Sequence, residues 1–104
     1  MKLMTEEIKK KLPKLYATED VPAEKKPIII KFFHPLSDWT WYACEGEQTE
    51  DGDWKFFGWV HGDFPEMGYF MLSELESIKV RGLPIERGRY FEGHMLSEAM
   101  KERI

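Results

Sequence analysis

The sequence lacks the features that mark secreted or membrane-bound proteins. It has one cysteine, Cys44, in 104 residues, which excludes an internal disulfide framework and favours a reducing, cytoplasmic compartment. No apolar run approaches the roughly 20 residues that span a bilayer, so no membrane association is expected. The N-terminal segment is densely charged, unlike a secretory signal peptide. We therefore expect a cytoplasmic protein.

An excess of basic residues is also missing. Lys and Arg number 15 against 19 Asp and Glu, for a net charge of -4. A protein that binds nucleic acid mainly through backbone phosphates needs a basic surface. We therefore do not expect this protein to bind nucleic acid through its overall surface charge. The length predicts one domain, residues 1–104.

Short motifs of catalysis are missing as well. The sequence contains no G-x-S-x-G, G-x-x-x-x-G-K or G-x-G-x-x-G, so nothing indicates a hydrolase nucleophile or a phosphate-binding loop. A nucleophilic Cys44 would need a base nearby, and we expect it to be a buried structural cysteine instead. No cofactor is predicted.

Aromatic residues, by contrast, are abundant. Seven Phe, four Trp and four Tyr make up 14% of the chain. Many of them lie between Phe32 and Trp59. Because aromatic side chains bury large areas, such a composition lets a small domain stabilise its core.

Local patterns predict an α+β fold: an antiparallel three- to four-stranded sheet packed by two or three short helices. The β-branched and aromatic runs indicate strands, and capping residues beside short amphipathic stretches indicate helices. The strands are expected at 28–33, 39–45, 54–61 and 67–72. The helices are expected at 5–11, capped by Thr5, at 74–80, with a Ser73–Glu76 capping box, and at 96–103. The stretches 21–27 and 85–93 read as irregular.

Opposite charges and aromatic pairs suggest a register for the sheet. The first hairpin is expected to pair Phe32 with Trp41 and Ile30 with Ala43. The second is expected to pair Glu45 with Lys55, Trp41 with Trp59, and Trp39 with His61. In this arrangement Trp39, Trp41 and Trp59 share one face of the sheet.

Both faces of this predicted sheet are apolar, whereas a sheet with one solvated face alternates apolar and polar residues. Three short helices would cover two faces with difficulty. We therefore predict a non-enzymatic binding or interaction module with a partly open aromatic face or groove. A symmetric homodimer, an unknown protein partner and a small ligand all remain open as occupants.

The same register brings polar residues together at one end of the sheet, namely His34, Asp38, His61 and Asp63. Two imidazoles and two carboxylates suit acid–base chemistry or a divalent metal, which makes a small enzyme the first alternative. No short metal-ligand motif is present, and the histidines could equally end the strands in solvent. We assign no metal and no catalytic residue.

A basic stretch supports a second alternative, a nucleic-acid-associated accessory protein. It consists of Lys79, Arg81, Arg87 and Arg89, with Tyr90 and Phe91 beside them. Arginines and aromatics together can bind phosphate and stack on a base. A solvated loop whose arginines pair with carboxylates is the simpler expectation.

Several segments together resemble one family. They are L-P-K-L-Y-A-T-E-D at 12–20, K-F-F-H-P at 31–35, W-T-W-Y at 39–42 followed by Glu45, F-G at 57–58, G-Y-F at 68–70 with S-E-L at 73–75, and G-L-P-I-E-R at 82–87. From about Leu12 to about Ser97 the chain is similar to the bacterial domain-of-unknown-function family 2958. The resemblance implies a small bacterial protein, often encoded on mobile elements, and it supplies no catalytic residue.

The resemblance also draws attention to Tyr16, Glu19 and Arg87. These residues match family motifs although they lie in segments without predicted secondary structure. We add them to Trp39, Trp41 and Trp59 as candidate ligand- or partner-binding residues. We expect the arm around Tyr16 and Glu19 to be fixed against the domain, with Tyr16 substantially buried and its hydroxyl hydrogen-bonded.

Overall fold

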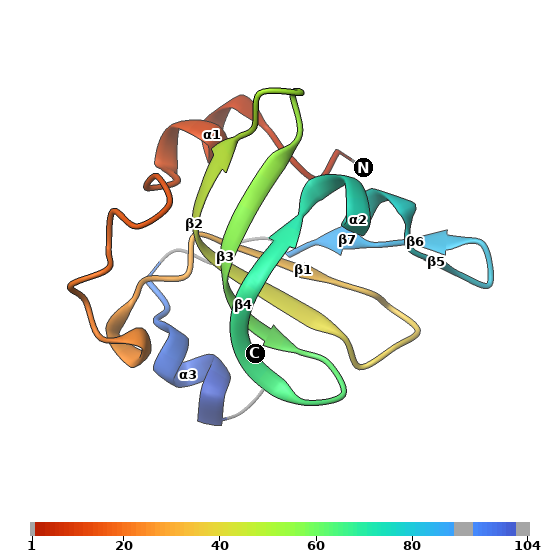
Figure 1. The fold of residues 1–104 in the computed structure, drawn as a ribbon. Helices are drawn as coiled ribbons and strands as arrows, with labels where there is room; N and C mark the ends of the chain where they lie inside the picture. The colour runs from red at the N-terminus through yellow and green to blue at the C-terminus, as the bar shows by residue number, and fades with distance from the viewer. Residues whose placement is uncertain (1, 89–92, 102–104) are drawn as a thin grey trace.

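A five-stranded antiparallel sheet forms the centre of the protein, with three short α-helices around it (Figure 1). The computed structural model describes residues 2–88 and 93–101. The strands lie in the order β4-β3-β2-β1-β7. They are β1 (Ile30–Phe33), β2 (Thr40–Gln48), β3 (Trp54–His61), β4 (Pro65–Met71) and β7 (Glu86–Arg87). The α+β prediction is confirmed, but the sheet has five strands rather than three or four.

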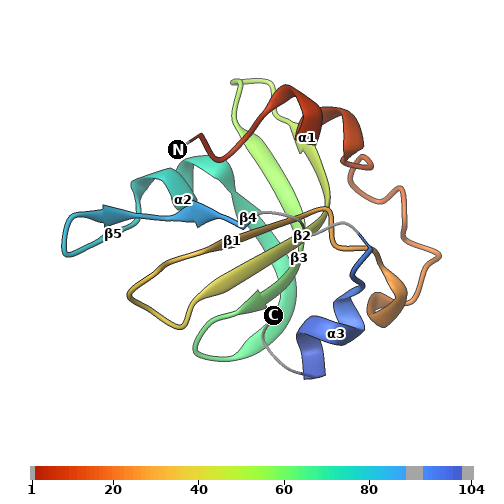
Figure 2. The ribbon, with the colours of Figure 1, turned by 180° about the vertical axis from the view of Figure 1, so that it is seen from behind.

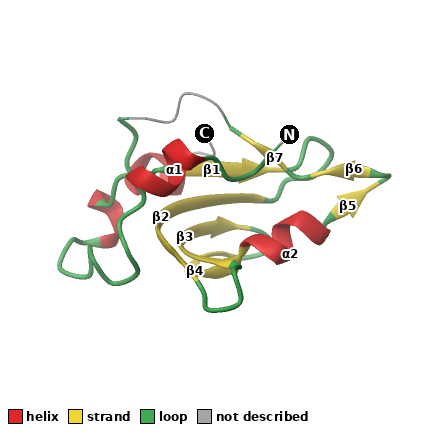
Figure 3. Ribbon diagram, turned by 90° about the horizontal axis from the view of Figure 1, so that it is seen from above, coloured by secondary structure: helices red, strands yellow, loops and turns green. Residues whose placement is uncertain are grey.

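The extra strand comes from a stretch that was expected to be irregular. Glu86 and Arg87 form β7 and pair with Phe33 and Phe32 of β1. Just before it, β5 (Lys79–Val80) and β6 (Leu83–Pro84) form a separate two-stranded hairpin that extends beyond the main sheet (Figure 3). Strands of two residues leave no alternating pattern in a sequence, which is why these three were missed. The helix predicted at 74–80 ends at Ser77 instead, and Lys79 and Val80 form β5.

The helices begin where local capping chemistry allows. They are α1 (Glu6–Lys11), α2 (Leu72–Ser77) and α3 (Leu96–Lys101), with a 3-10 turn η1 (Ala23–Lys25). The Thr5 hydroxyl accepts from the Ile8 N–H at the start of α1, as predicted. The capping box predicted for Ser73 and Glu76 is wrong: helix α2 starts at Leu72, and Glu74 accepts from the Met71 N–H. Residues 102–104 of the predicted last helix lie outside the described residues.

The first predicted hairpin register is confirmed. Ile30 pairs with Ala43 and Phe32 with Trp41. The second register is wrong: Trp41 pairs with Val60 rather than with Trp59. Lys55 lies opposite Glu47 and not opposite Glu45.

Two local features of strand β2 cause this error. The strand continues through Gly46 to Gln48, a segment that was expected to be loop. The pairing also shifts between Ala43 and Glu45, which leaves Cys44 as an extra residue in a β-bulge. Because side chains alternate between faces, a one-residue shift moves Trp59 to the face opposite Trp41.

Each face of the sheet therefore has its own core. The face toward α1 and α2, hereafter the α2 face, buries Leu3, Met4, Leu12, Ile30, Phe32, Trp41, Ala43, Trp54, Phe56, Phe70, Leu75 and Ile85. On this face Phe56 packs between Phe32 and Phe70, with ring centroids 5.5 and 5.3 Å away. Each aromatic pair of this kind adds about 0.5–1.5 kcal/mol beyond its buried area.

The opposite face, hereafter the α3 face, lies toward the blue helix α3 (Figure 2). It buries Ile28, Tyr42, Cys44, Leu96 and Ala99, with Phe57, Trp59, Met67 and Met100 packed against them. Both faces thus have extensive cover, and large exposed apolar side chains lie mainly in turns, near sheet edges and in the N-terminal arm. On the α3 face, Phe57, Trp59 and Met67 are half-buried and Tyr69 is 47% exposed, so this face is only partly covered near β3 and β4.

Candidate functional site

The turns of three hairpins point toward one side of the protein, away from α1 (Figures 1 and 2). The β1–β2 and β3–β4 turns lie at the same end of the sheet, because each strand runs antiparallel to the one before it. The Trp39 ring lies directly over the backbone of Gly62, where a Cβ atom would come within 2.4 Å of it. Any side chain at position 62 would therefore displace Trp39.

His34 connects the third hairpin to the first. This buried side chain lies beside the Leu83 carbonyl, with Nε2 at 2.7 Å, and its Nδ1 accepts from the Leu36 N–H at 2.9 Å. Because a neutral imidazole has one donor and one acceptor, Nε2 is the nitrogen that carries the proton and donates to Leu83. The backbones at Leu36 and Leu83 are thus held on either side of one ring.

Four large apolar side chains are exposed at these turns. Phe64 is 81% exposed, Leu36 51%, Leu83 44% and Trp39 38%. We call these four residues the hairpin-end surface. Single exposed apolar residues are ordinary, but a group at one end of a small protein is typical of an interaction site.

Trp39 is held rigidly within this surface. Its ring lies 5.7 Å from the buried Trp41 ring at an interplanar angle of 35°, and its backbone N–H donates to the Ser37 hydroxyl. Rigid aromatic side chains lose little entropy on binding and often dominate binding energy. Trp39 therefore has the properties of an anchor residue.

The charged residues in the β1–β2 and β3–β4 turn segments have one sign. Segments 34–39 and 61–66 contain Asp38, Asp63 and Glu66 and neither Lys nor Arg. All three carboxylates belong to exposed residues. These two segments therefore contribute only negative charge to the hairpin-end surface, whereas the β5–β6 turn contributes Arg81.

The predicted His/Asp cluster has a different local structure from the one expected. Both ring nitrogens of His34 bond to backbone groups, so its imidazole has no nitrogen left for a ligand. His61 pairs with Thr40 instead of Trp39, and its Nδ1 has no hydrogen-bond partner in the described part of the chain. Within residues 2–88 and 93–101, no three His, Cys, Asp or Glu side chains are close enough to hold a metal ion.

The three candidate tryptophans do not share one surface. Trp41 is buried in the α2 face and supports Trp39. Trp59 packs on the α3 face, where its Nε1 finds no hydrogen-bond partner among the described residues. Only Trp39 is exposed enough to contact a partner directly.

The N-terminal arm is fixed, as predicted, through its backbone and through a contact between the Tyr16 and Tyr69 rings, whose centroids lie 6.5 Å apart. The backbone N–H groups of Tyr16 and Thr18 both donate to Glu45, at 2.8 and 3.1 Å. Tyr16 has a left-handed backbone, with φ of 70°, and its side chain is 62% exposed, so the predicted burial is wrong. Glu19 is exposed.

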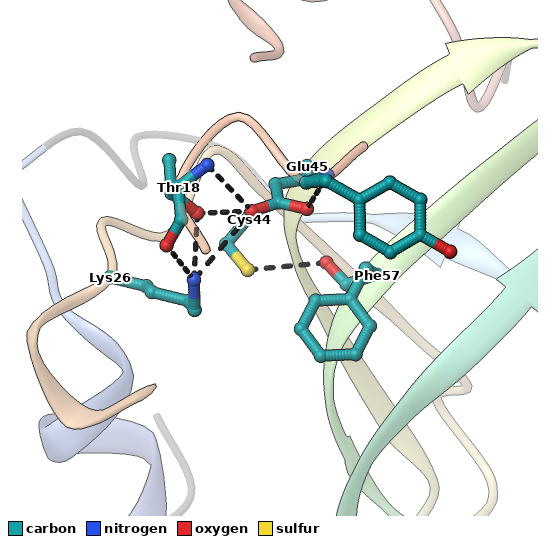
Figure 4. Close-up of polar contacts among 6 residues, drawn as sticks. Thr18, Lys26, Cys44, Glu45 and Phe57 are labelled. Atoms are coloured by element: carbon teal, nitrogen blue, oxygen red, sulfur yellow. Dashed lines mark hydrogen bonds and ion pairs between the residues drawn. The ribbon is translucent and has the colours of Figure 1, made fainter. Parts of the chain in front are cut away.

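A buried ionic network, absent from the sequence analysis, holds this arm (Figure 4). The Glu45 carboxylate also accepts from the Thr18 hydroxyl and lies 3.6 Å from the Lys26 ammonium. Lys26 in turn donates to the Thr18 carbonyl and hydroxyl. The expected pairing of Glu45 with Lys55 is therefore wrong, and Lys26, in the stretch 21–27 that was expected to be irregular, is buried.

The electrostatics of this network are those of a structural site. Burial by itself raises the pKa of Glu45, but hydrogen bonds from Thr18 and Tyr16 and the Lys26 charge lower it overall. Burial, followed by the Glu45 charge, raises the pKa of Cys44 to about 12, and the thiol donates to the Phe57 carbonyl. A thiol in that state is not a nucleophile at neutral pH.

The basic stretch has a structural role where it is described. Arg87 donates from Nη1 to the Lys2 carbonyl at 2.6 Å and ties the N-terminal segment to strand β7. Arg81 occupies the β5–β6 turn with a positive φ of 54°. Arg89, Tyr90 and Phe91 lie outside the described residues.

The fold and this surface define a small α+β domain with a turn-borne apolar surface and no recognisable catalytic constellation in its described part. The model of a family described as "Protein of unknown function (DUF2958)" matches residues 3–102, so the chain belongs to that family. No curated protein and no solved structure matches the chain. No helix in the described part of the chain is long and apolar enough to cross a membrane.

Proposed function

We propose that this protein is a non-enzymatic binding module that docks a protein partner through the hairpin-end surface. The observation that carries the proposal is the placement of exposed Leu36, Trp39, Phe64 and Leu83 at the ends of three hairpins while both sheet faces have extensive cover. Fixed contacts at Gly62 and His34 maintain this placement without a partner. A surface that is already ordered binds at low entropic cost.

The chemistry of the partner follows from the charges. Asp63 and Glu66 flank Phe64, and segments 34–39 and 61–66 contain neither Lys nor Arg. A partner segment that combines an apolar or aromatic residue with Lys or Arg would fill the surface and pair with these carboxylates. We propose such a basic, apolar protein segment in the bacterial cytoplasm as the ligand; the single buried Cys44 and the family resemblance support that compartment.

A peptide selection tests this proposal directly. A phage-displayed library of random 12-residue peptides is selected on the wild-type protein, and the enriched peptides are synthesised and measured by fluorescence anisotropy. We expect sequences that combine Lys or Arg with an aromatic or large aliphatic residue. We also expect their amide chemical-shift changes to cluster at residues 34–39 and 61–66.

Two matched variants make the result specific. The double substitution Leu36→Ser and Phe64→Ser removes two exposed side chains of the surface and is expected to weaken binding at least tenfold. The control, Tyr16→Ser with Met95→Ser, removes two exposed apolar side chains outside that surface and is expected to leave binding unchanged. Equal loss in both variants, enrichment of acidic peptides, or no enrichment at all would overturn the proposal.

A further inference from the structure

The two edges of the main sheet differ in how they are protected. On one side β7 has only two residues, and Arg87 ties the N-terminal segment to it. On the other side β4 has seven residues, and no described strand pairs with its outer edge. An open edge strand is a template for another strand, and proteins usually block such edges with charges, proline or bulges.

Strand β4 has these protections only at its beginning. Pro65 and Glu66 come first, and the remaining five residues, Met67 to Met71, are without charge or proline. The pairing between β3 and β4 runs through all seven residues without a shift, so no bulge bends the edge away. The edge is therefore regular and apolar along most of its length.

Two contacts show which backbone groups of β4 point outward. The Phe57 carbonyl accepts from the Cys44 thiol on the β2 side, so at Phe57 the backbone faces away from β4. The Met71 N–H is bonded to Glu74 rather than to β3. Because antiparallel pairs alternate, Tyr69 and Met67 likewise direct their N–H and C=O groups away from β3.

We propose that this edge of β4 pairs antiparallel with β4 of a second copy of the chain, on a two-fold axis through Gly68. In that register Met67 of each copy lies opposite Tyr69 of the other. These are the two residues of β4 that offer both an outward N–H and an outward C=O. Their pairing forms four backbone hydrogen bonds and joins the two five-stranded sheets into one.

Other registers leave more backbone hydrogen-bonding groups of the β4 edge without a partner. A register that places Met67 opposite Met67 of the second copy pairs Tyr69 with Pro65, which has no N–H. A register that places Tyr69 opposite Tyr69 of the second copy pairs Met67 with Met71, whose N–H already bonds to Glu74. The register centred on Gly68 is thus the one in which the outward donors and acceptors match.

The side chains near the axis are compatible with this pairing. Met67 packs on the α3 face, and Tyr69, which is 47% exposed, lies on the same face with its ring 4.9 Å from that of Phe57. In the dimer each Met67 would cover the Tyr69 of the other copy. A Cβ atom at Gly68 would meet nothing within 4 Å, so the axis itself is open. The dimer therefore reduces exposed apolar surface without a clash at its centre.

Sedimentation equilibrium over micromolar to millimolar protein tests the association. We expect a concentration-dependent dimer for the wild type. Met67→Pro removes an outward N–H and no bond to β3, so it is expected to leave the fold intact and to weaken the dimer at least tenfold. Phe64→Lys, in the turn before β4, is the control and is expected to dimerise like the wild type.

A disulfide test fixes the register. The two Gly68 residues would form a non-hydrogen-bonded pair with Cα atoms about 4.5 Å apart, which is within the range of a disulfide. Gly68→Cys is therefore expected to cross-link rapidly under mild oxidation, whereas buried Cys44 stays reduced. Glu66→Cys would place its two thiols roughly four residues apart along the strands, about 13 Å, and is expected not to cross-link.

The outcomes separate this proposal from the proposed function. A monomer at millimolar concentration, or equal cross-linking of Gly68→Cys and Glu66→Cys, would overturn the β4 dimer and leave the hairpin-end surface untouched. A dimer that Phe64→Lys dissociates and Met67→Pro does not would also overturn it, because the hairpin-end surface would then be the contact.

Discussion

The Lys26 ammonium and the Glu45 carboxylate face each other at 3.6 Å inside the protein, and both side chains are almost fully buried. Neither belongs to the sheet-to-helix packing that forms the two cores. The pair joins the segment before β1 to strand β2, and Thr18 between them brings in the N-terminal arm. The packing of about twenty N-terminal residues against the domain therefore depends partly on one carboxylate.

Glu45→Gln is expected to destabilise the protein strongly. The substitution leaves the Lys26 charge buried without its counter-charge, and breaking a buried pair in this way costs about 3–5 kcal/mol. Urea unfolding followed by circular dichroism measures this loss. Glu47→Gln is the control: Glu47 is exposed and accepts from the Leu15 N–H, a bond that glutamine retains. A loss of similar size in both variants would contradict a special role for Glu45.

Acid is expected to weaken the same network. Because folding lowers the pKa of Glu45, the folded protein binds this proton less tightly than the unfolded chain does. The resulting stability is complete above the ordinary glutamate pKa of about 4.3 and is lost as the pH falls toward the lower folded value. The free energy of unfolding is therefore expected to decline below about pH 4.5.

A variant pair isolates this contribution from other carboxylates. Thr18→Ala removes the hydroxyl that lowers the pKa of Glu45, whereas Thr18→Ser retains a hydroxyl. Both variants retain Asp53 and Glu98, whose pKa values are also lowered, so these two carboxylates affect both curves equally. Urea unfolding from pH 3 to pH 7 should give a shallower acid decline for Thr18→Ala than for Thr18→Ser. Parallel curves would show that this hydroxyl does not set the acid sensitivity.

The local part of the fold could be predicted from the sequence. The first hairpin register follows from the short turn after His34 and the match of Ile30 and Phe32 with Ala43 and Trp41. Helix α1 follows from Thr5 and the charges on either side of Ile8. In both places the determining residues are close together in the chain, so local preferences and the fold agree.

The non-local part could not be predicted in the same way. Nothing in the sequence around Cys44 announces a bulge, and that one extra residue reverses the face of Trp59. Lys26 and Glu45 are far apart in the chain, and each had a plausible solvent or cross-strand partner. The hairpin-end surface did leave a signal, because Leu36 and Phe64 are large apolar residues inside turn segments.

Cys44 is expected to resist thiol reagents in the folded protein. Burial and the neighbouring Glu45 charge raise its pKa to about 12, so very little thiolate exists at pH 8. Ellman's reagent should label one thiol at once in about 6 M guanidinium chloride, a concentration at which even very stable domains unfold. Under native conditions the label should appear only as fast as the protein opens. Rapid native labelling would mean that the bulge exposes Cys44.

His34→Ala is expected to loosen the hairpin-end surface as well as the fold. The ring supplies an acceptor to the Leu36 N–H and a donor to the Leu83 carbonyl, and its removal leaves both groups and a cavity behind. Losses of this kind cost roughly 2–4 kcal/mol together. Amide hydrogen exchange is expected to accelerate first in the β5–β6 hairpin, because His34 Nε2 bonds directly to its backbone at Leu83.

Two conservative variants separate the two bonds of this ring. Asn at position 34 places an acceptor near Nδ1 but does not reach Leu83, whereas Gln reaches toward Leu83 without an acceptor at the Nδ1 position. His34→Asn is therefore expected to protect the Leu36 amide and to free the β5–β6 hairpin, and His34→Gln to do the reverse. Equal exchange rates in the two variants would show that the imidazole acts through its volume rather than through its hydrogen bonds. In that case Leu36 and Leu83 would not owe their fixed positions to His34.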